Sequence, residues 1–83
     1  MIKIYSSNWC SYCNAAKNLL IELNISFEEI NIEENNISRE DLLKLSGGHT
    51  VPQICINEKF IGGYTELQIL YQNGKLWDIA NDK

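Results

Sequence analysis

The spacing of apolar residues changes near residue 10, and this change constrains the fold most strongly. Ile2 and Ile4 alternate with polar residues, which is typical of a strand. From about Ser11 to Leu23 apolar residues recur every three or four positions, which predicts an amphipathic helix. The apolar residues of 27–32 predict a second strand. Strand, helix and strand in so short a stretch favour an α/β fold.

Two further elements are expected in the middle of the chain. Ser38 followed by Asp41 resembles a capping box, and the helix that it opens should stop at Gly47. A nearly continuous apolar run over 51–56 predicts a strand buried on both faces. A turn at 57–59 then leads into a short hairpin partner.

The last part of the chain predicts one more helix. Thr65 can cap it and Gly74 can end it, before a short tail that carries Leu76, Trp77 and Ile79. We expect Trp77 to be part of the core. The predicted order is therefore β-α-β-α-β-β-α.

Length and charge limit what the protein can do. Eighty-three residues suit one small domain, 1–83. A net charge of -4 would repel phosphate backbones and anionic membranes, so a nucleic acid is not an expected partner. No apolar run approaches the roughly 18 residues that span a bilayer, and Met1 to Tyr5 lacks the apolar stretch of a signal peptide. We therefore expect no membrane association and a cytoplasmic location.

The acidic residues are expected to form a solvated face without function: Glu28, Glu29, Glu33 and Glu34.

Cys10 and Cys13 stand at the start of the first predicted helix. They are one helical turn apart, so their sulfur atoms can meet. Cys10 lies where unpaired N–H groups and the helix dipole favour an anion, which lowers the pKa of its thiol. It is the candidate nucleophile, and Cys13 can attack a mixed disulfide formed on it. Three cysteines, two of them so close, favour a redox or metal site over a structural framework.

A zinc site is the alternative use of these cysteines. Cys10, Cys13, His49 and Cys55 could supply four ligands on paper. His49 and Cys55 are six residues apart across an expected strand, roughly 20 Å if it is fully extended. One ion cannot bind both, so we expect Cys55 to be a small buried hydrophobe and His49 an ordinary polar residue.

Four ordered segments together closely resemble the glutaredoxins. They are Tyr5, then Cys10-Ser11-Tyr12-Cys13 with Ala16-Lys17, then Thr50-Val51-Pro52-Gln53-Ile54, and then Gly62-Gly63-Tyr64-Thr65-Glu66-Leu67. The likeness spans nearly the whole chain. It implies a thioredoxin-like fold, a four-stranded mixed sheet flanked by helices. It also implies a glutathione-dependent thiol-disulfide oxidoreductase that reduces protein-glutathione mixed disulfides and protein disulfides.

The resemblance also implies a role for each matching residue. Cys10 resembles the family's nucleophile, Cys13 its resolving thiol, and Tyr12 the aromatic residue that borders the glutathione sulfur. Pro52 is implied to be a cis-proline that leaves the Val51 backbone free to bind glutathione as an added strand. The residues implied to bind glutathione are Tyr12, Thr50, Val51, Pro52, Gly63, Tyr64, Thr65 and Glu66.

The start of the last helix is implied to bind one end of glutathione. Backbone N–H groups at Thr65 match the place that takes the γ-glutamyl carboxylate. Glu66 stands where many relatives have Asp, and its carboxylate could pair with the ligand's amino group. Ser7 and Gly48 depart from the family, because basic residues are common at both positions. Lys44 and His49 are the possible substitutes.

Two other functions remain open. Ser11 replaces the commoner proline, and a Cys-Ser-Tyr-Cys motif resembles glutaredoxins in which two subunits and two glutathiones hold a [2Fe-2S] cluster through Cys10-type thiolates. The protein is otherwise expected to be a monomer. Trp9 before Cys10 suggests a small thioredoxin instead. That alternative is weakened by Ser11-Tyr12, where Gly-Pro would be expected.

Overall fold

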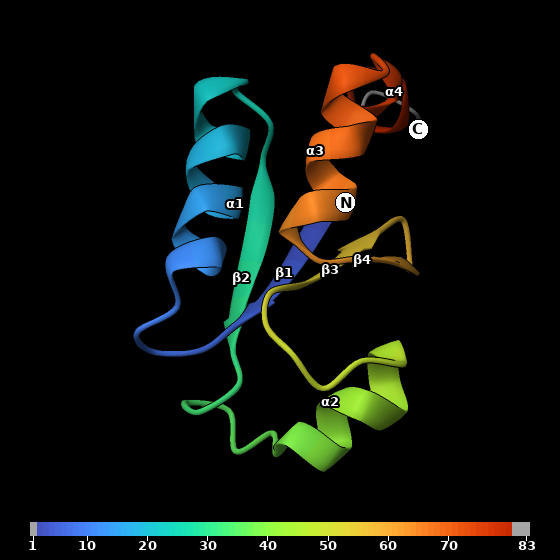
Figure 1. The fold of residues 1–83 in the computed structure, drawn as a ribbon. Coiled ribbons are helices and arrows are strands. Elements are labelled where there is room, and N and C mark those ends of the chain that lie inside the picture. The colour runs from blue at the N-terminus through green and yellow to red at the C-terminus, as the bar shows by residue number, and fades with distance from the viewer. Residues whose placement is uncertain (1, 81–83) are drawn as a thin grey trace.

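The fold is a mixed sheet of four strands with helices packed on it (Figure 1). The structure, a computed structural model, describes residues 2–80. Its elements in chain order are β1 (Ile2–Ser6), α1 (Ser11–Glu22), β2 (Phe27–Asn31), α2 (Arg39–Ser46), β3 (Gln53–Ile56), β4 (Lys59–Gly62), α3 (Tyr64–Gln72) and α4 (Lys75–Ala80). The strands lie in the order β2-β1-β3-β4, with β1 and β2 parallel and the other pairs antiparallel. The four-stranded mixed sheet expected from the resemblance is confirmed.

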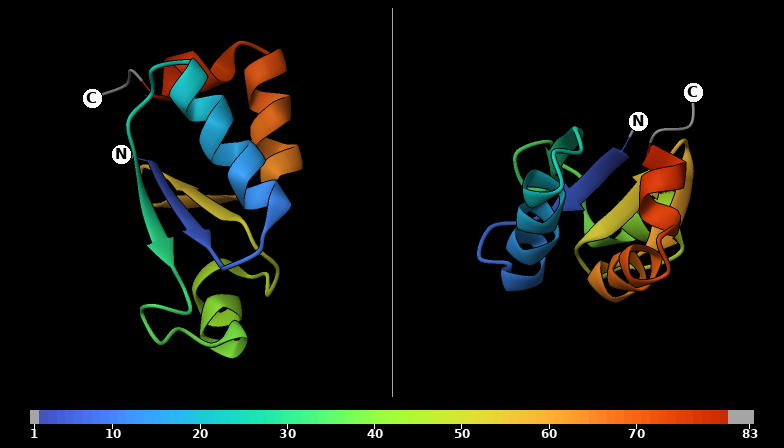
Figure 2. Two further views of the ribbon diagram at one scale, coloured as in Figure 1. Left: turned by 90° about the vertical axis from the view of Figure 1, so that its left-hand side faces the viewer. Right: turned by 90° about the horizontal axis from the view of Figure 1, so that it is seen from above.

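The core lies between the sheet and the helices α1 and α3, which share one of its faces (Figure 2). Alternation along β1 turns Ile2 and Ile4 toward these helices, and both are buried. Leu20 of α1 and Leu67 of α3 are fully buried in the same cluster. Truncating a buried leucine to alanine costs about 2–5 kcal/mol, so this cluster fixes how α1 sits on the sheet.

Helix α2 lies apart from α1 and α3, beyond the end of β1 (Figures 1 and 2). The expected capping box is present, because Asp41 N donates to Ser38 Oγ at 3.0 Å and Ser38 N donates to Asp41 Oδ2 at 3.2 Å. Gly47 ends the helix in the left-handed region, at φ 83°. The segment that follows runs back to the sheet beside the start of α1 (Figure 1).

Two expectations about element boundaries were wrong. Strand β3 begins at Gln53 rather than Val51, because Pro52 has no N–H to donate to the sheet. Thr65 is not a cap: α3 begins at Tyr64 and its N-cap is Gly63.

The expected C-terminal tail is instead the helix α4, in which Leu76 is fully buried. Leu76 packs into the core cluster, and a helix with one buried face allows this contact. The expectation for Trp77 concerns a side chain outside those that the structure describes. Within residues 2–80, no helix is long and apolar enough to cross a membrane.

Candidate functional site

Cys10 is the N-cap of α1, at the end of the loop that leaves β1. Its backbone is extended, and its carbonyl accepts the Asn14 N–H at 3.1 Å, the first bond of the helix. Its Sγ accepts the Cys13 N–H at 3.1 Å. One of the unpaired donors of the helix start is therefore directed at the sulfur. The predicted position of Cys10 at a helix N-terminus is confirmed.

The two cysteines are joined by a disulfide but differ in exposure. Their Cα atoms are 5.2 Å apart. Cys10 is half-buried, whereas Cys13 is only 1% exposed. A molecule in solution can therefore approach the Cys10 sulfur but not the Cys13 sulfur. Cys55, the remaining cysteine, is free and buried in β3, as expected.

The Val51–Pro52 segment lies against Cys10. The peptide bond between these two residues is cis, as the resemblance implies. The Val51 carbonyl oxygen lies 3.8 Å from Cys10 Sγ. Because Val51 precedes the first residue of β3, its backbone lies outside the sheet ladder and remains accessible beside the sulfur.

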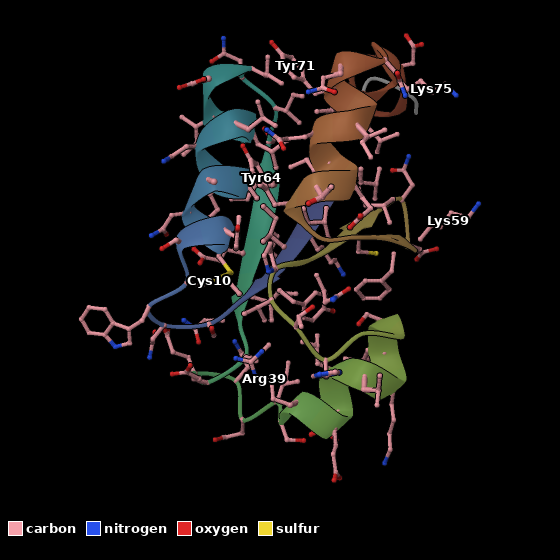
Figure 3. All side chains as sticks on the ribbon, in the orientation of Figure 1. Cys10, Arg39, Lys59, Tyr64, Tyr71 and Lys75 are labelled. Atoms are coloured by element: carbon pink, nitrogen blue, oxygen red, sulfur yellow. A yellow bond between two sulfur atoms is a disulfide. The ribbon has the colours of Figure 1, made fainter. Side chains whose placement is uncertain are left out.

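A cavity of about 570 Å³ opens beside this segment. Small-molecule sites typically measure roughly 300–1,000 Å³, so the cavity can hold a small ligand. The rings of Tyr12 and Tyr64, 6.2 Å apart, form part of its wall. Figure 3 shows Tyr64 at the start of α3, on the side of Cys10 that faces α3. The lining residues are Tyr12, Ser46, Gly47, Gly48, Thr50, Val51, Pro52, Gln53, Gly62, Gly63, Tyr64, Thr65 and Glu66. The structure thus brings together all eight residues named from the resemblance.

The start of α3 is shaped by a close contact between two glycines and Glu66. Gly63 N donates to Glu66 Oε1 at 2.7 Å, so one carboxylate oxygen is engaged in closing the first turn. Gly62 has φ 116°, which only glycine adopts readily, and an added Cβ would lie 2.8 Å from Glu66 Cγ. These constraints fix where the free N–H groups of α3 point.

A buried glutamine also lines the cavity, and sequence reasoning assigned it no role. Gln53 is 6% exposed, and its Nε2 donates to the Thr50 carbonyl at 2.9 Å. A Cβ at Gly48 would lie 2.7 Å from that Nε2. A basic residue at position 48 would therefore displace the Gln53 amide, which gives a physical reason for the departure at Gly48.

Arg39 is a candidate for the missing cation near the cavity, and sequence reasoning did not identify it. It is the only arginine of the chain and the first residue of α2, and its Nη1 donates to the His49 carbonyl at 3.0 Å. In the view of Figure 3, Arg39 and Tyr64 lie on opposite sides of Cys10. Arg39 and the expected substitutes Lys44 and His49 are all exposed, and none of them is part of the cavity lining. Arg39 differs in that its bond to the His49 carbonyl holds it beside Thr50, which is part of the lining.

Side-chain hydrogen bonds hold the loop on the other side of Cys10. Asn8 donates twice to Glu33, from its backbone N at 3.2 Å and from its Nδ2 at 2.6 Å. Asn31 Nδ2 donates to Asn8 Oδ1 at 3.0 Å, and Asn31 Oδ1 accepts the N–H of Glu33 at 2.9 Å. The loop before Cys10 is therefore fixed to the connection between β2 and α2. The acidic residues were expected only to be solvated, and for Glu33 that expectation is incomplete.

Glu29 is a second acidic residue with a structural role. Its Oε2 accepts from Lys17 Nζ at 2.8 Å and from the buried Ser6 Oγ at 2.7 Å. The Lys17 bond first, and then the Ser6 bond, hold the pKa of Glu29 below its usual range. This ion pair joins α1 to β2 near the site.

The zinc alternative finds no support in the side-chain arrangement. Within the described part of the chain, no three His, Cys, Asp or Glu side chains lie together as metal ligands. His49 is exposed on the segment after α2, whereas Cys55 is buried in β3.

Comparison with known proteins gives one consistent family. The glutaredoxin family model matches residues 2–61. The chain is 43% identical over 75 residues to glutaredoxin 3 of Escherichia coli (strain K12), covering 90% of each chain. It is 40% identical over 75 residues to a glutaredoxin of Pseudomonas aeruginosa, covering 90% of this chain and 89% of that one.

Solved structures agree with the sequence comparison. The crystal structure of a buckwheat glutaredoxin-glutathione complex matches with a TM-score of 0.86 and 28% identity, covering 95% of this chain and 74% of that chain. The fold is therefore thioredoxin-like, and its cysteine pair at the start of α1 has the arrangement that redox chemistry requires. From its sequence, its fold and its paired cysteines, the chain belongs to the glutaredoxin family of thiol oxidoreductases.

Proposed function

We propose that this protein is a glutathione-dependent thiol-disulfide oxidoreductase that reduces protein-glutathione mixed disulfides and protein disulfides. One observation carries the proposal: the half-buried Cys10 sulfur accepts the Cys13 N–H and lies beside a cavity of small-ligand size. The N–H group and the dipole of α1 stabilise a thiolate at this position. The cavity can hold the molecule to which that sulfur becomes bonded.

The first reaction exchanges one disulfide for another. The Cys10 thiolate attacks the glutathione sulfur of a mixed disulfide, and the substrate sulfur leaves as a thiolate that takes a proton from water. A second glutathione thiolate attacks the glutathione sulfur on Cys10. Glutathione disulfide leaves, and Cys10 returns to the thiolate. Glutathione therefore supplies the two electrons that reduce the substrate.

Cys13 acts when the substrate is a protein disulfide. Its thiolate attacks the Cys10 sulfur of the mixed disulfide, and the substrate leaves as a thiolate. The product is the Cys10–Cys13 disulfide, the state that this structure contains. Because Cys13 is buried, it reacts with a sulfur bonded to Cys10 rather than with a free substrate. Two glutathiones then restore both thiols.

We assign the cavity to glutathione. The Val51 backbone, which lies outside the sheet ladder, can bond the cysteinyl part as an added strand. The N–H groups of Tyr64 and Thr65, in the first turn of α3, can take the γ-glutamyl carboxylate. Glu66 can pair with the amino group through its second oxygen, since Oε1 is bonded to Gly63. The glutathione complex of the buckwheat glutaredoxin supports this assignment.

Other lining residues complete the proposed site. The Tyr12 and Tyr64 rings can pack against the glutathione sulfur and its neighbouring atoms, and Thr50 and Pro52 border the Val51 backbone. The glycyl carboxylate needs a cation, which Ser7 and Gly48 do not offer. We assign that role to Arg39, which is bonded to the backbone next to Thr50.

The remaining parts of the proposal concern setting and assembly. A close cysteine pair that cycles between thiol and disulfide suits the reducing cytoplasm, and we propose that location. Proteins that are glutathionylated or that carry disulfides are the proposed partners. Nothing in the proposed reaction requires a second subunit, so a monomer is sufficient.

A glutathione-bridged [2Fe-2S] dimer is the second candidate function. Ser11 is exposed at the first position of α1, where a proline would fix φ and remove an N–H near the Cys10 sulfur. Cys10 would be the ligand from this chain, and a second chain and two glutathiones would supply the rest. Anaerobic reconstitution should give visible absorbance and a dimer on sizing, both reduced in Ser11→Pro. A colourless monomer contradicts this candidate.

The primary proposal is tested by asking what reduces the oxidised protein. Glutathione with glutathione reductase should reduce the Cys10–Cys13 disulfide, whereas thioredoxin reductase should not. The reduction potential should lie at about -200 to -230 mV, rather than at about -270 mV as in thioredoxin. Reduction by thioredoxin reductase alone, with the lower potential, would support a small thioredoxin instead.

A further inference from the structure

The loop between β1 and α1 holds a large aromatic side chain in water directly beside Cys10. Trp9 is 101% exposed, the largest value among the exposed hydrophobic side chains that the structure describes. Its backbone has φ 60°, in the left-handed region that bulky residues seldom adopt. The left-handed backbone works against folding stability, and the unburied indole contributes no burial of apolar surface to offset that cost. Such an outlier next to a reactive sulfur suggests a function in binding.

The exposure of Trp9 is fixed by its neighbours. Asn8, the residue before it, is bonded through its backbone N and its side chain to Glu33, and again to Asn31. Cys10, the residue after it, is anchored as the N-cap of α1. The two residues that flank Trp9 are therefore both held in place, and the indole stands between them.

The surroundings of Trp9 carry negative charge. Both oxygens of the Glu33 carboxylate accept bonds from Asn8, which is neutral, so those bonds leave its charge in place. Glu34 is exposed next to it. Glu29, by contrast, is paired with Lys17. Residues 5–16 contain no lysine or arginine. We call the surface formed by Asn8, Trp9, Glu33 and Glu34 the Trp9 face.

We propose that the Trp9 face docks the protein half of the substrate and favours a cysteine that is flanked by lysine or arginine. A mixed disulfide has two halves, and the cavity, whose lining does not include Trp9, takes only the glutathione half. A lysine or arginine of the substrate protein, which we call the client, contacts the face of the indole, and the nearby carboxylates attract its positive charge. This inference rests on the proposed function, because Cys10 must first react with that disulfide.

A second copy of this chain is the competing occupant, and charge disfavours it. The chain has a net charge of -4, and pairing two Trp9 faces would bring Glu33 and Glu34 of both copies together. A basic segment of another protein has the complementary charge. The Trp9 face therefore fits a cationic client rather than itself.

The test uses three glutathionylated peptides that differ only beside the cysteine, with flanking lysines, glutamines or glutamates. The kcat/KM of each is divided by that of the same enzyme on the mixed disulfide of glutathione and 2-mercaptoethanol, so a general change in Cys10 reactivity cancels. We expect the lysine peptide to exceed the glutamine peptide by about two- to fivefold, as an exposed cation–π contact gives. The glutamate peptide should fall below both. The preference should shrink as salt rises.

Variants assign the preference to the face. Trp9→Ala should bring the lysine-to-glutamine ratio close to one, and Trp9→Phe should retain part of it. Glu33→Gln should lower the ratio, whereas Glu22→Gln, an equal charge change at the far end of α1, should leave it unchanged. A wild-type ratio of one, or a ratio that Trp9→Ala does not change, overturns the inference. Concentration-dependent dimerisation that Trp9→Ala abolishes also overturns it.

Failure of the proposed function gives a different result. If the enzyme does not turn over the small mixed disulfide, the reaction itself is wrong, whatever the peptides do. The face is then tested by binding alone, with the same peptides carrying serine for cysteine. The Trp9 indole N–H resonance, assigned by its loss in Trp9→Ala, should shift with the lysine peptide and not with the glutamate peptide. Equal shifts, or no shift, would reject the Trp9 face as a docking surface for basic segments.

Discussion

The two sides of Cys10 are built in different ways. On the cavity side, backbone groups are placed by turns, namely the segment before β3 and the glycines before α3. On the Trp9 side, the loop is held by side chains from the connection that follows β2. A backbone site can bind a constant ligand whatever the nearby side chains are, whereas a side-chain site changes with each substitution. The first suits glutathione and the second suits a choice among client proteins.

The largest expected effect distinguishes the roles of Cys10 and Cys13, whose sulfur atoms lie between these two sides. Cys10→Ser should lower turnover of every disulfide by more than about a thousandfold, because the remaining thiol of the pair, Cys13, is buried and cannot meet a substrate in solution. Cys13→Ser should still remove glutathione from mixed disulfides but should lose reduction of protein disulfides, which need a resolving thiol. Coupled assays with one substrate of each kind measure both. Equal loss in the two variants on a glutathione mixed disulfide would contradict the division of roles.

Adjacent glycines test how strictly the cavity side depends on its backbone. Gly62→Ala should destabilise the protein by about 1–3 kcal/mol, because φ is 116° and the new Cβ would meet Glu66. Gly63→Ala is the comparison: its φ of -104° suits any residue, but its Cβ would lie 3.2 Å from the Pro52 carbonyl oxygen, which is a tight contact with backbone, so it should cost less than Gly62→Ala without being neutral. Urea denaturation gives both values. A loss in Gly62→Ala that is no larger than the loss in Gly63→Ala would show that the positive φ at position 62 does not require glycine.

A positive charge added at Ser7, in the loop between β1 and α1, should affect both sides. Ser7→Lys should lower the KM for glutathione by up to about fivefold and lower the pKa of Cys10, since a nearby cation favours both anions. It should also weaken the preference for basic peptides by neutralising part of the Trp9 face. Thiolate absorbance against pH and turnover at low and high salt measure these effects. An unchanged pKa and KM at low salt would mean that position 7 is remote from both anions.

The smallest effect concerns an acid that is already paired. Because the folded-state pKa of Glu29 is lowered, its stabilisation is present above its ordinary pKa of about 4.5 and is lost as the pH falls through the folded value. Glu29→Gln should therefore cost less than about 1 kcal/mol at pH 7, and the difference should vanish in acid. Glu28→Gln, on the exposed neighbour, is the control. A loss that persists in acid would mean that Lys17 and Ser6 do not stabilise the carboxylate.

The cavity side could largely be predicted from the sequence. The helix start at Cys10 follows from local spacing, and Val51, Pro52 and Thr65 were placed by the resemblance. The errors arose where one residue overrides a local pattern. Pro52 delays the start of β3, and the bond from Gly63 N to Glu66 moves the helix cap away from Thr65.

The Trp9 side could not be predicted, because its contacts join distant segments. Asn8 and Glu33 are 25 residues apart, and only the parallel pairing of β1 with β2 brings their connecting loops together. Arg39 was missed for a similar reason, since its bond to His49 depends on how the segment after α2 turns back. From the sequence, Trp9 could be either a packed aromatic residue or an exposed platform for partners, and only the structure shows that it is exposed, on a left-handed backbone.

The central claim is that glutathione bonded to Cys10 occupies the cavity side and leaves the Trp9 side free. Amide NMR spectra of the Cys13→Ser protein, with and without glutathione joined to Cys10 as a mixed disulfide, test it directly. We predict that the largest shifts occur at Val51, Tyr64 and Thr65, with little change at Asn8 and Glu33. Shifts centred on Asn8, Trp9 and Glu33, with Val51 and Thr65 unmoved, would contradict the account.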